Sequence, residues 1–425
     1  MNRALARCIV ESLRVTGPFE ESLGRLRAFS RRDWQHTLAW LDDSGLALYF
    51  WDRLNRFGAS DALPAEIGAQ LERDLASNQR RLAEMQKEFD SLNRRFEAAG
   101  VEYVVLKGFA LIPDYCPDAA LRTQYDYDYL VHPKSANVAQ RTLELAGYSQ
   151  KNKNPGFQLP FFAAQPLSLP SPNDNFYSAD IPRTVELHSS LWESADRDMI
   201  NLQLPGDALD RKRPMNWEGL CFPVLEDDDT LVFQTLHAFQ HILIYWCRPS
   251  CFLEIARFIA RRHSDASFWE RFRSRFEGRK YLPEIAGLIF SLATSLFEAP
   301  VPKQVAAWTT RNLPAALSLW VQRHGRNWVL ACFPGSKLSL FVHREFVEDP
   351  DAWNQVILTR LFPVHRPARA VESGNPTLMS RALATWDQWR FVWSRLAFHL
   401  GALLDYLWEL PRWKLLLYHA QQDHI

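Results

Sequence analysis

The 425-residue sequence has no excess of charge of either sign. Lys and Arg together number 49, Asp and Glu together number 49, and the formal net charge at pH 7 is zero. A protein that holds nucleic acid through its phosphates carries a basic surface, and a local basic patch is still compatible with this balance. The composition therefore disfavours a dedicated nucleic-acid-binding protein.

The chain also has little cysteine and lacks a long apolar run. Six cysteines scattered over 425 residues do not resemble a disulfide framework and fit a reducing compartment. Charged residues interrupt the first eleven positions, so we expect no secretion signal. The most apolar late segment, residues 396–410, contains His399, Asp405 and Glu409 and is shorter than the roughly 20 residues of a membrane span. We predict a buried helix there, no membrane span and a cytoplasmic location.

Hydrophobic residues make up 47% of the chain and aromatic residues 13%, which indicates a packed globular protein of two or three domains. Residues 1–99 have helical periodicity, including residues 34–56. An apolar stripe after Pro64 predicts an amphipathic helix of about nine turns that ends at Gly100 and packs into the core. We expect an N-terminal helical region over residues 1–99.

At Gly100 the pattern changes to extended structure. We predict strands over residues 101–106, 125–131 and 184–188, with a short helix over residues 109–115. Prolines interrupt residues 149–182, which are expected to form an irregular insertion with at most short hairpin strands. The predicted fold class is α+β, with a small mixed sheet in a core of residues 100–225.

Residues 226–425 are expected to form a C-terminal helical region. Its first predicted helix, residues 231–245, follows the acidic run of residues 226–229, which we expect to be a solvated first turn. Apolar periodic segments that predict further helices cover residues 252–259, 281–297, 313–331 and 386–417.

The strand of residues 125–131 carries the candidate chemistry. Successive side chains of a strand alternate between faces, so Asp126 and Asp128 point the same way, and Glu186 and His188 share one face of a later strand. Two adjacent carboxylates repel each other unless a cation lies between them, and Mg²⁺ is the usual one. An exposed polar edge strand is the alternative, but the apolar neighbours favour a buried strand, in which unpaired acids are costly.

Several spaced elements together resemble the bacterial family of uncharacterised nucleotidyltransferases, within the DNA polymerase β-type superfamily. They are Leu106-Lys107-Gly108, Arg122, Asp126 to Val131, Ala146-Gly147-Tyr148 and Glu186-Leu187-His188. The resemblance covers residues 30 to 260 well and extends to the segment with His237 and His241. It implies a mixed sheet flanked by helices, with Asp126, Asp128 and Glu186 as catalytic residues that hold one or two Mg²⁺ ions.

The resemblance also implies that Lys107, Gly108 and Arg122 bind the phosphates of an NTP. His188, on the same strand face as Glu186, is expected to orient a ligand, to contact the substrate or to be a structural histidine. The sequence departs from the superfamily at one position. Most members have Gly followed by Gly or Ser, whereas Phe109 follows Gly108 here, so the phosphate role of this turn is open.

His237, His241, Cys247 and Cys251 form a second constellation, in which the two histidines share a helix face. A zinc site is conceivable, but the cysteine spacing is not that of a zinc knuckle. We favour histidines that pack against the core or line an acceptor cleft.

The leading functional hypothesis is a metal-dependent nucleotidyltransferase that moves an NMP from Mg-NTP, such as ATP, to an acceptor hydroxyl or phosphate and releases pyrophosphate. The acceptor is unknown, and a small molecule, sugar, peptide or protein fits better than RNA because the chain lacks net positive charge. The alternative is a nucleotidyltransferase-like nucleotide sensor or interaction protein without turnover.

Overall fold

The computed structural model describes residues 1–150, 158–163, 176–181, 183–192, 199–204, 206, 208–332, 335–362 and 378–422. Two compact units make up the chain. The first consists of Met1–Glu193, Leu202–His241 and Cys247–Leu313, and the second of Ser194–Asn201, Ile242–Trp246 and Pro314–Ile425. The first unit contains the whole sheet and every candidate site residue.

Residues 1–99 are helical, as predicted. The helices are α1 (Arg3–Ser12), α2 (Phe19–Leu26), α3 (Arg31–Asp43), α4 (Ala47–Arg56), the 3₁₀ turn Ser60–Ala62 and α5 (Ala65–Ala98). Ser30 and Asp33 form a capping box that begins α3, since each side chain binds the other residue's backbone N–H. The predicted helical segment 34–56 is divided between α3 and α4 because Gly45 has a positive φ of 70°.

Helix α5 is the long amphipathic helix expected from the apolar stripe. It follows Pro64 and ends before Gly100, whose φ of 67° is the left-handed conformation typical of a helix end. The Phe89 ring of α5 lies 4.8 Å from that of Phe109 and 4.9 Å from that of Phe222, between ring centroids. The stripe therefore packs into the core, against the sheet and the turn that leads to it.

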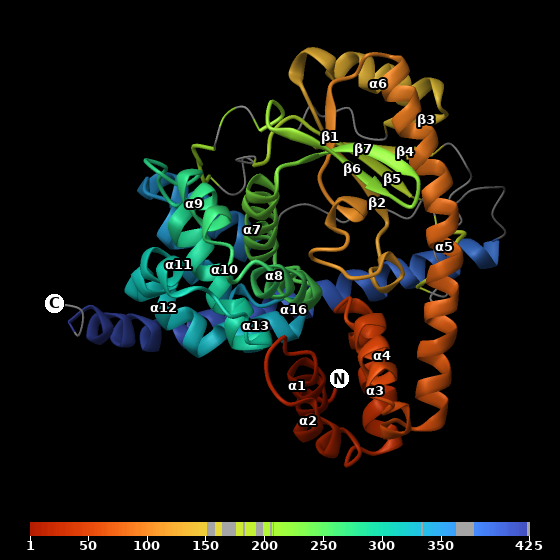
Figure 1. The fold of residues 1–425 in the computed structure, drawn as a ribbon. Helices are drawn as coiled ribbons and strands as arrows, with labels where there is room; N and C mark the ends of the chain where they lie inside the picture. Colours follow the sequence, from red (N-terminus) through yellow and green to blue (C-terminus); the bar gives the residue numbers. More distant parts are fainter. Residues whose placement is uncertain are drawn as a thin grey trace. The chain divides into compact units, whose positions relative to one another are not determined.

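The described residues form one seven-stranded mixed sheet with the strand order β3-β4-β5-β2-β1-β7-β6. Strands β2 and β5 pair in parallel, as do β1 and β7, and the other neighbours are antiparallel. Together with the flanking helices in Figure 1, this sheet confirms the predicted α+β class. The strands are β1 (Tyr103–Val105), β2 (Asp126–Val131), β3 (Tyr148–Gln150), β4 (Gln158–Ala163), β5 (Thr184–His188), β6 (Lys212–Trp217) and β7 (Leu220–Leu225).

Short helical segments connect the strands. They are the 3₁₀ turns Gly108–Leu111, Ala119–Leu121 and Pro133–Ser135, and helix α6 (Ala136–Leu145). The helix predicted over residues 109–115 is thus a shorter 3₁₀ turn. Within the expected insertion of residues 149–182, β3 and β4 form an antiparallel pair, in agreement with the short hairpin strands that we predicted. Residues 151–157, 164–175 and 182 of this insertion lie outside the described residues.

The two faces of β2 have different neighbours. The Tyr127 hydroxyl donates to the backbone oxygen of Met85 at 3.1 Å and to Glu88 at 2.8 Å, so the face with Tyr127 and Tyr129 packs against α5. Side chains alternate along a strand, which leaves Asp126 and Asp128 on the opposite face. The acids therefore point away from α5, which runs along one side of the sheet in Figure 1.

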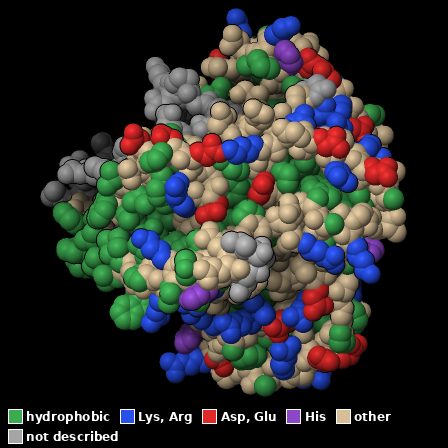
Figure 2. All heavy atoms as spheres, turned by 90° about the vertical axis from the view of Figure 1, so that its left-hand side faces the viewer, with side chains coloured by type: hydrophobic (Ala, Val, Ile, Leu, Met, Phe, Trp, Pro, Cys, Tyr) green, Lys and Arg blue, Asp and Glu red, His purple; other side chains and the backbone are tan. Residues whose placement is uncertain are grey.

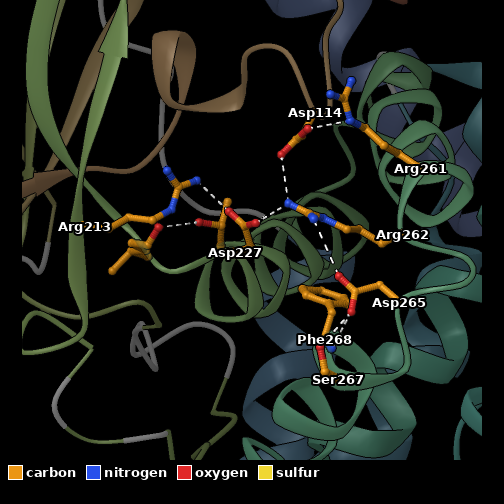
Figure 3. Close-up of polar contacts among 10 residues, drawn as sticks. Asp114, Arg213, Asp227, Arg261, Arg262, Asp265, Ser267 and Phe268 are labelled. Atoms are coloured by element: carbon orange, nitrogen blue, oxygen red, sulfur yellow. Dashed lines mark hydrogen bonds and ion pairs between the residues drawn. The ribbon is translucent and has the colours of Figure 1, made fainter.

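After the sheet, the first unit is helical. Its elements are α7 (Asp227–Leu243), α8 (Pro249–Arg261), α9 (Ala266–Ser274), α10 (Leu282–Phe297), α11 (Lys303–Trp308) and the 3₁₀ turn Thr310–Asn312. The Asp227 carboxylate at the start of α7 binds Arg213 of β6 and Arg262, the residue after α8 (Figure 3). Arg262 also contacts Asp114 at 3.3 Å. This network connects the sheet to α7 and α8.

The acidic run forms the first turn of α7, but Asp228 and Asp229 are not solvated, so that part of the prediction was wrong. Asp228 is 1% exposed and Asp229 is fully buried. Arg275 binds Asp228 at 2.7 Å, and Arg211 binds Asp229 at 2.7 Å. Because each buried carboxylate meets an arginine that is distant in sequence, a local pattern could not reveal these ion pairs.

The second unit contains α12 (Ala315–Trp320), the π-helical turn Val321–Gly325, α13 (Arg326–Ala331), the 3₁₀ turn Lys337–Ser339, α14 (Leu340–His343), the 3₁₀ turn Arg344–Phe346, α15 (Pro350–Leu361) and α16 (Leu378–Gln422). Helix α16 buries Ala402, Tyr406, Glu409 and Trp413. The helix predicted over residues 396–410 is present, but it is not buried throughout, because Leu396, Leu400, Leu404, Leu407 and Trp408 are each more than half exposed.

Large exposed hydrophobic side chains gather on the molecular face drawn in Figure 2. Those that α16 contributes to the exposed surface include Trp386, Trp389 and Trp393. No helix among the described residues combines the length and the apolarity needed to cross a membrane.

Candidate active site

The parallel pairing of β2 with β5 brings the predicted acids together. Asp128 is the register partner of Glu186, and Asp126 is the partner of Thr184. Paired residues of neighbouring strands project to the same face, so Asp126, Asp128 and Glu186 share the face that α5 does not cover. The positions of the three carboxylates on one face agree with the alternation expected from the sequence.

Asp128 is the most enclosed of the three acids, with 2% of its surface exposed. Its Oδ1 atom accepts from Lys107 Nζ at 2.7 Å and lies 2.9 Å from His188 Nε2. His188 Nε2 is also 3.8 Å from Glu186 Oε2. The other oxygen of Asp128, Oδ2, is buried and accepts from no N–H or hydroxyl group among the described residues, although a protonated Glu186 carboxyl forms a hydrogen bond with Asp128. A buried carboxylate oxygen without an N–H or hydroxyl donor is costly and is a natural ligand for a cation.

Burial and mutual repulsion shift the ionisation of this cluster. Burial and the nearby Asp128 charge raise the pKa of Asp126, and burial together with Asp128 and Asp126 raises the pKa of Glu186 to about 8. Burial opposes ionisation of Asp128 as well, but Lys107 and His188 hold the pKa of Asp128 well below its usual range. Lys107 thus stabilises the charge of Asp128, while Asp126 and Glu186 are still repelled by the neighbouring carboxylates. A divalent cation would relieve this repulsion.

Three potential ligand atoms of this cluster lie within 4.8 Å of one another. They come from Asp128, Glu186 and His188. The set of three includes His188 instead of Asp126, although Asp126 is on the same face two residues before Asp128. The two carboxylates suit a hard divalent cation that keeps waters and takes further oxygen ligands from a substrate, whereas the His188 imidazole contacts Asp128 Oδ1.

The turn after β1 places Lys107 beside Asp128. Gly108 begins this turn with a φ of 64°, and a Cβ atom there would lie 2.5 Å from Gln124 Oε1. Both observations explain why glycine occupies the position. Phe109 is 1% exposed, and its ring stacks on Trp217 at 4.8 Å between centroids. Phe109 is therefore a core residue, whose side chain is not free to take part in the site.

Arg122 is committed to a buried ion pair. Its Nε donates to Glu254 Oε1 of α8 at 3.2 Å, and Nη1 donates to Gln124 at 3.4 Å. Glu254 also accepts from the Tyr49 hydroxyl at 2.9 Å. Arg122 thus lies close to the turn at Gly108, but its guanidinium already neutralises a carboxylate.

His237 and His241 lie next to each other on α7, with 3.1 Å between their Nε2 atoms. Burial lowers the pKa of His237 well below its usual value, and the charges of Lys107, His241, Arg122 and His188 act in the same direction. His237 is consequently within electrostatic range of Lys107 and His188, which both contact Asp128, and its imidazole is neutral at physiological pH.

Sequence reasoning missed two arginines beside Tyr125, the residue before β2. The guanidinium of Arg81 lies 4.4 Å from the Tyr125 ring centroid and that of Arg248 lies 5.6 Å from it. Arg81 is 1% exposed and donates to the Ser178 backbone oxygen at 2.9 Å, while its Nε and Nη2 have no acceptor among the described residues. Burial lowers the pKa of Arg81 to about 10. The signal available in the sequence was an arginine at a core-facing position of an amphipathic helix.

The mixed sheet thus carries Asp126 and Asp128 at alternate positions of β2 and Glu186 on the parallel neighbour β5. The family model described as "Uncharacterised nucleotidyltransferase" matches residues 30–298. The chain belongs to this family, as the sequence motifs predicted. No curated protein matches the chain.

Proposed function

We propose that this protein transfers an NMP group from an NTP to an acceptor hydroxyl or phosphate, with release of pyrophosphate. One observation carries the proposal, which is the alignment of Asp128 with Glu186 in a parallel strand pair, with Asp126 on the same face. Family membership supports the same reaction class. The fold alone would not be sufficient, because function depends on the residues of the site.

Asp126, Asp128 and Glu186 are the residues that would hold Mg²⁺. The buried Oδ2 of Asp128 without an N–H or hydroxyl donor and the raised pKa values of Asp126 and Glu186 fit such a role. Bound Mg²⁺ neutralises the triphosphate and lowers the pKa of an attacking hydroxyl in this chemistry. Glu186, which is less buried than Asp128, would face the acceptor side.

Cationic side chains around the cluster would hold the phosphates. Lys107 pairs with Asp128 and is positioned to contact a triphosphate that approaches this carboxylate. Arg248, whose charge acts on Asp126, offers an Nε that has no acceptor among the described residues. Arginine is well suited to bind phosphate oxygens because its planar guanidinium donates several hydrogen bonds. Gly108 would allow the backbone to approach the same phosphates.

The chemical step is an in-line displacement. An oxygen of the acceptor attacks the α-phosphorus, the bond from this phosphorus to the bridging oxygen of the β-phosphate breaks, and pyrophosphate leaves with the bonding electrons. An acceptor hydroxyl gives up its proton to solvent or to a site carboxylate. The protein contributes orientation and fixed charges, which lower the barrier more than covalent chemistry does in phosphoryl transfer.

We place the acceptor next to α7, where His237 and His241 would contact it. The balanced charge of the chain favours a small molecule, sugar, peptide or protein over RNA. None of the six cysteines, all of which are among the described residues, forms a disulfide, and we place the reaction in the reducing cytoplasm.

A nucleotide sensor without turnover is the second candidate, and the turn at Gly108 favours it. Phe109 occupies the position at which related enzymes have a small residue, and its ring is locked between Phe89 and Trp217. Arg122 is similarly held by Glu254. These contacts reduce the number of groups free to stabilise a departing pyrophosphate.

A transfer assay separates the two candidates. Each of the four α-labelled NTPs is incubated with the protein, Mg²⁺ and fractionated cell extract, and labelled product and pyrophosphate are measured. A transferase forms labelled product, and Asp128→Asn reduces the rate at least about 100-fold, as expected when a catalytic charge is removed. The exposed Asp405→Asn serves as the matched control. Tight NTP binding without product in any fraction would favour the sensor.

A further inference from the structure

A second group of ligand atoms lies on the helices next to the carboxylate cluster. His237 and His241 of α7 and Cys251 of α8 each offer one atom, and these three atoms lie within 4.8 Å of one another. All three residues are partly exposed. The group shares no residue with Asp126, Asp128 or Glu186.

We propose that His237, His241 and Cys251 form a transition-metal site, with Zn²⁺ as the best-suited ion and a fourth coordination position open. Two imidazoles and one thiolate are ligands that Zn²⁺ prefers over the hard cation Mg²⁺. Three protein ligands and one free position are typical of zinc sites that bind water or a substrate. The inference does not require the proposed nucleotidyl transfer, although an ion held by His237 and His241 would take the place given above to their contacts with the acceptor.

The spacing of the nitrogen atoms fits this coordination. Tetrahedral Zn²⁺ with bonds of about 2.0–2.1 Å holds two imidazole nitrogens about 3.3 Å apart. The Nε2 atoms of His237 and His241 are 3.1 Å apart. Residues four apart on a helix share one face, so the helical backbone of α7 itself places the two imidazoles together.

Cys251 distinguishes a metal site from a simple histidine pair. A hydrogen bond between neutral imidazoles explains the 3.1 Å separation, but it gives no reason for a thiol from another helix to approach both rings. Pro249 begins α8 and so places Cys251 in its first turn. The partial exposure of all three residues gives an ion access from solvent.

Fixed contacts outside the group hold the two helices. Asp227 at the start of α7 binds Arg262 directly after α8, as Figure 3 shows. Glu254, one turn after Cys251, is held by Tyr49 and Arg122. Ligands on supported helices need little rearrangement to bind an ion.

The charged residues around the three ligands include both cations, which repel a metal ion, and an anion, which attracts it. Lys107 and Arg122 are within electrostatic range of His237, which disfavours a dication. Burial and the nearby Glu254 charge raise the pKa of Cys251 to about 11, so the thiol ionises only when a bound cation replaces its proton. The resulting thiolate reduces the net charge of the bound ion by one. These surroundings disfavour Mg²⁺, which is bound mainly through charge, more than Zn²⁺, which also bonds strongly to thiolate sulfur.

Cobalt substitution of the full-length protein tests the proposal. The chelator-treated protein is titrated with Co²⁺, whose absorption reports both thiolate ligation and tetrahedral geometry, and Zn²⁺ is then added in competition. We expect one equivalent of Co²⁺ to produce a thiolate charge-transfer band that Zn²⁺ abolishes. A folded wild-type protein without this band overturns the proposal, whatever the variants do.

Variants identify the ligands. Cys251→Ser and His237→Gln are expected to weaken Zn²⁺ binding at least about 100-fold, because direct ligands matter more than the supporting groups that cost roughly 10- to 100-fold. The exposed Cys221→Ser and His36→Gln are matched controls that leave the affinity unchanged. Equal affinity of Cys251→Ser and wild type, with both folded by circular dichroism, contradicts the assignment.

A further variant separates this site from the carboxylate cluster. Asp126→Asn should retain the cobalt band, because Asp126 belongs to the other group. Loss of the band in Asp126→Asn would show that the two sites are one and would overturn the separate metal site. Failure of NTP binding with an intact cobalt band would instead count against the proposed function alone.

Discussion

At the residue scale, Asp128 is a buried charge whose stability depends on its ion-pair partner. Its side chain is 1% exposed and that of Lys107 is 11% exposed, so neither charge is solvated well. Lys107→Met is expected to lower the free energy of unfolding by about 3–5 kcal/mol, because the remaining carboxylate loses its main partner. Urea unfolding without Mg²⁺ measures the change.

The control is Lys87→Met, which breaks an exposed ion pair with Glu84 and should cost less than about 1 kcal/mol. The double variant Lys107→Met/Asp128→Asn removes both buried charges and should be less destabilised than the sum of its single variants. Additive losses would mean that the two side chains do not depend on each other.

Gly108 is a residue where backbone conformation and space both require glycine. Gly108→Ala is expected to lower the free energy of unfolding by about 1–2 kcal/mol, the cost of a left-handed conformation in an ordinary residue. The Cβ atom would also press on Gln124 Oε1. Gly24→Ala is the control, since no atom lies within 4 Å of its Cβ position on α2, and it should be neutral or stabilising. A neutral Gly108→Ala would contradict this explanation.

Asp42 of α3 predicts a pH dependence of stability. Burial raises the pKa of Asp42 to about 7, although the Tyr177 hydroxyl donates to it at 2.7 Å and opposes the shift. The folded chain therefore keeps a proton that the unfolded chain releases between pH 4 and 7. This contribution to the free energy of unfolding falls as pH rises through that range, by up to about 1.4 kcal/mol per pH unit.

Asp42→Asn keeps an acceptor for Tyr177 and removes the titration. Denaturant unfolding from pH 4.5 to 7.5 should give a flatter profile for the variant, with its largest gain over wild type at the upper end. Asp74, whose pKa is raised to about 6 mainly by burial, titrates in both proteins, and its charge also raises the pKa of Asp42, so the variant loses this repulsion as well. Parallel profiles for the two proteins would rule out Asp42 as the source.

At the scale of elements, α5 supports the sheet face opposite the acids. Phe89 contacts Phe109 and Phe222, which belong to the turn after β1 and to β7. Phe89→Ala is expected to lower the free energy of unfolding by about 3–5 kcal/mol, because it leaves a cavity in an aromatic core. Thermal and urea unfolding test this against the exposed Glu84→Ala of the same helix, which should change stability by less than about 0.5 kcal/mol. Similar losses for both variants would contradict the packing described for Phe89.

Elements with strong periodic patterns could be predicted from the sequence. The stripe of α5 and the alternating acids of β2 and β5 are local features of the chain. Strands β6 and β7 were not predicted. Glu218 and Gly219 form their two-residue turn, in which both residues have positive φ, but Glu-Gly is not one of the dipeptides that signal such a turn in a sequence. Prolines in both strands, Pro214 and Pro223, weaken the strand pattern.

At the scale of the whole molecule, the sequence indicated which acids share a face but not what each one contacts. The ion pair of Arg122 with Glu254 joins residues 132 positions apart, so no local pattern predicts that Arg122 is already neutralised. The arginines at positions 81 and 248 reach Tyr125 from different helical regions for the same reason. Long-range pairing therefore decides which cations are available to a nucleotide.

Which apolar side chains of α16 are exposed also depends on contacts that are distant in the sequence. A sequence rich in Trp and Leu predicted burial, because large apolar residues are usually inside a protein. The described part of α16 buries one narrow face of Ala402, Tyr406 and Trp413 within the second unit. Composition predicted the helix, whereas the contacts made by each face depend on the rest of the unit.

The central claim is that Asp126, Asp128 and Glu186 form a metal site for an NTP. Calorimetric titration of each NTP into wild type, Asp126→Asn and the control Asp405→Asn, with and without Mg²⁺, tests it most directly. We predict Mg²⁺-dependent binding by wild type and the control, and a loss of at least about 10-fold in affinity, or about 1.4 kcal/mol, in Asp126→Asn. Equal Mg²⁺-dependent affinity in Asp126→Asn and wild type would contradict the proposed site.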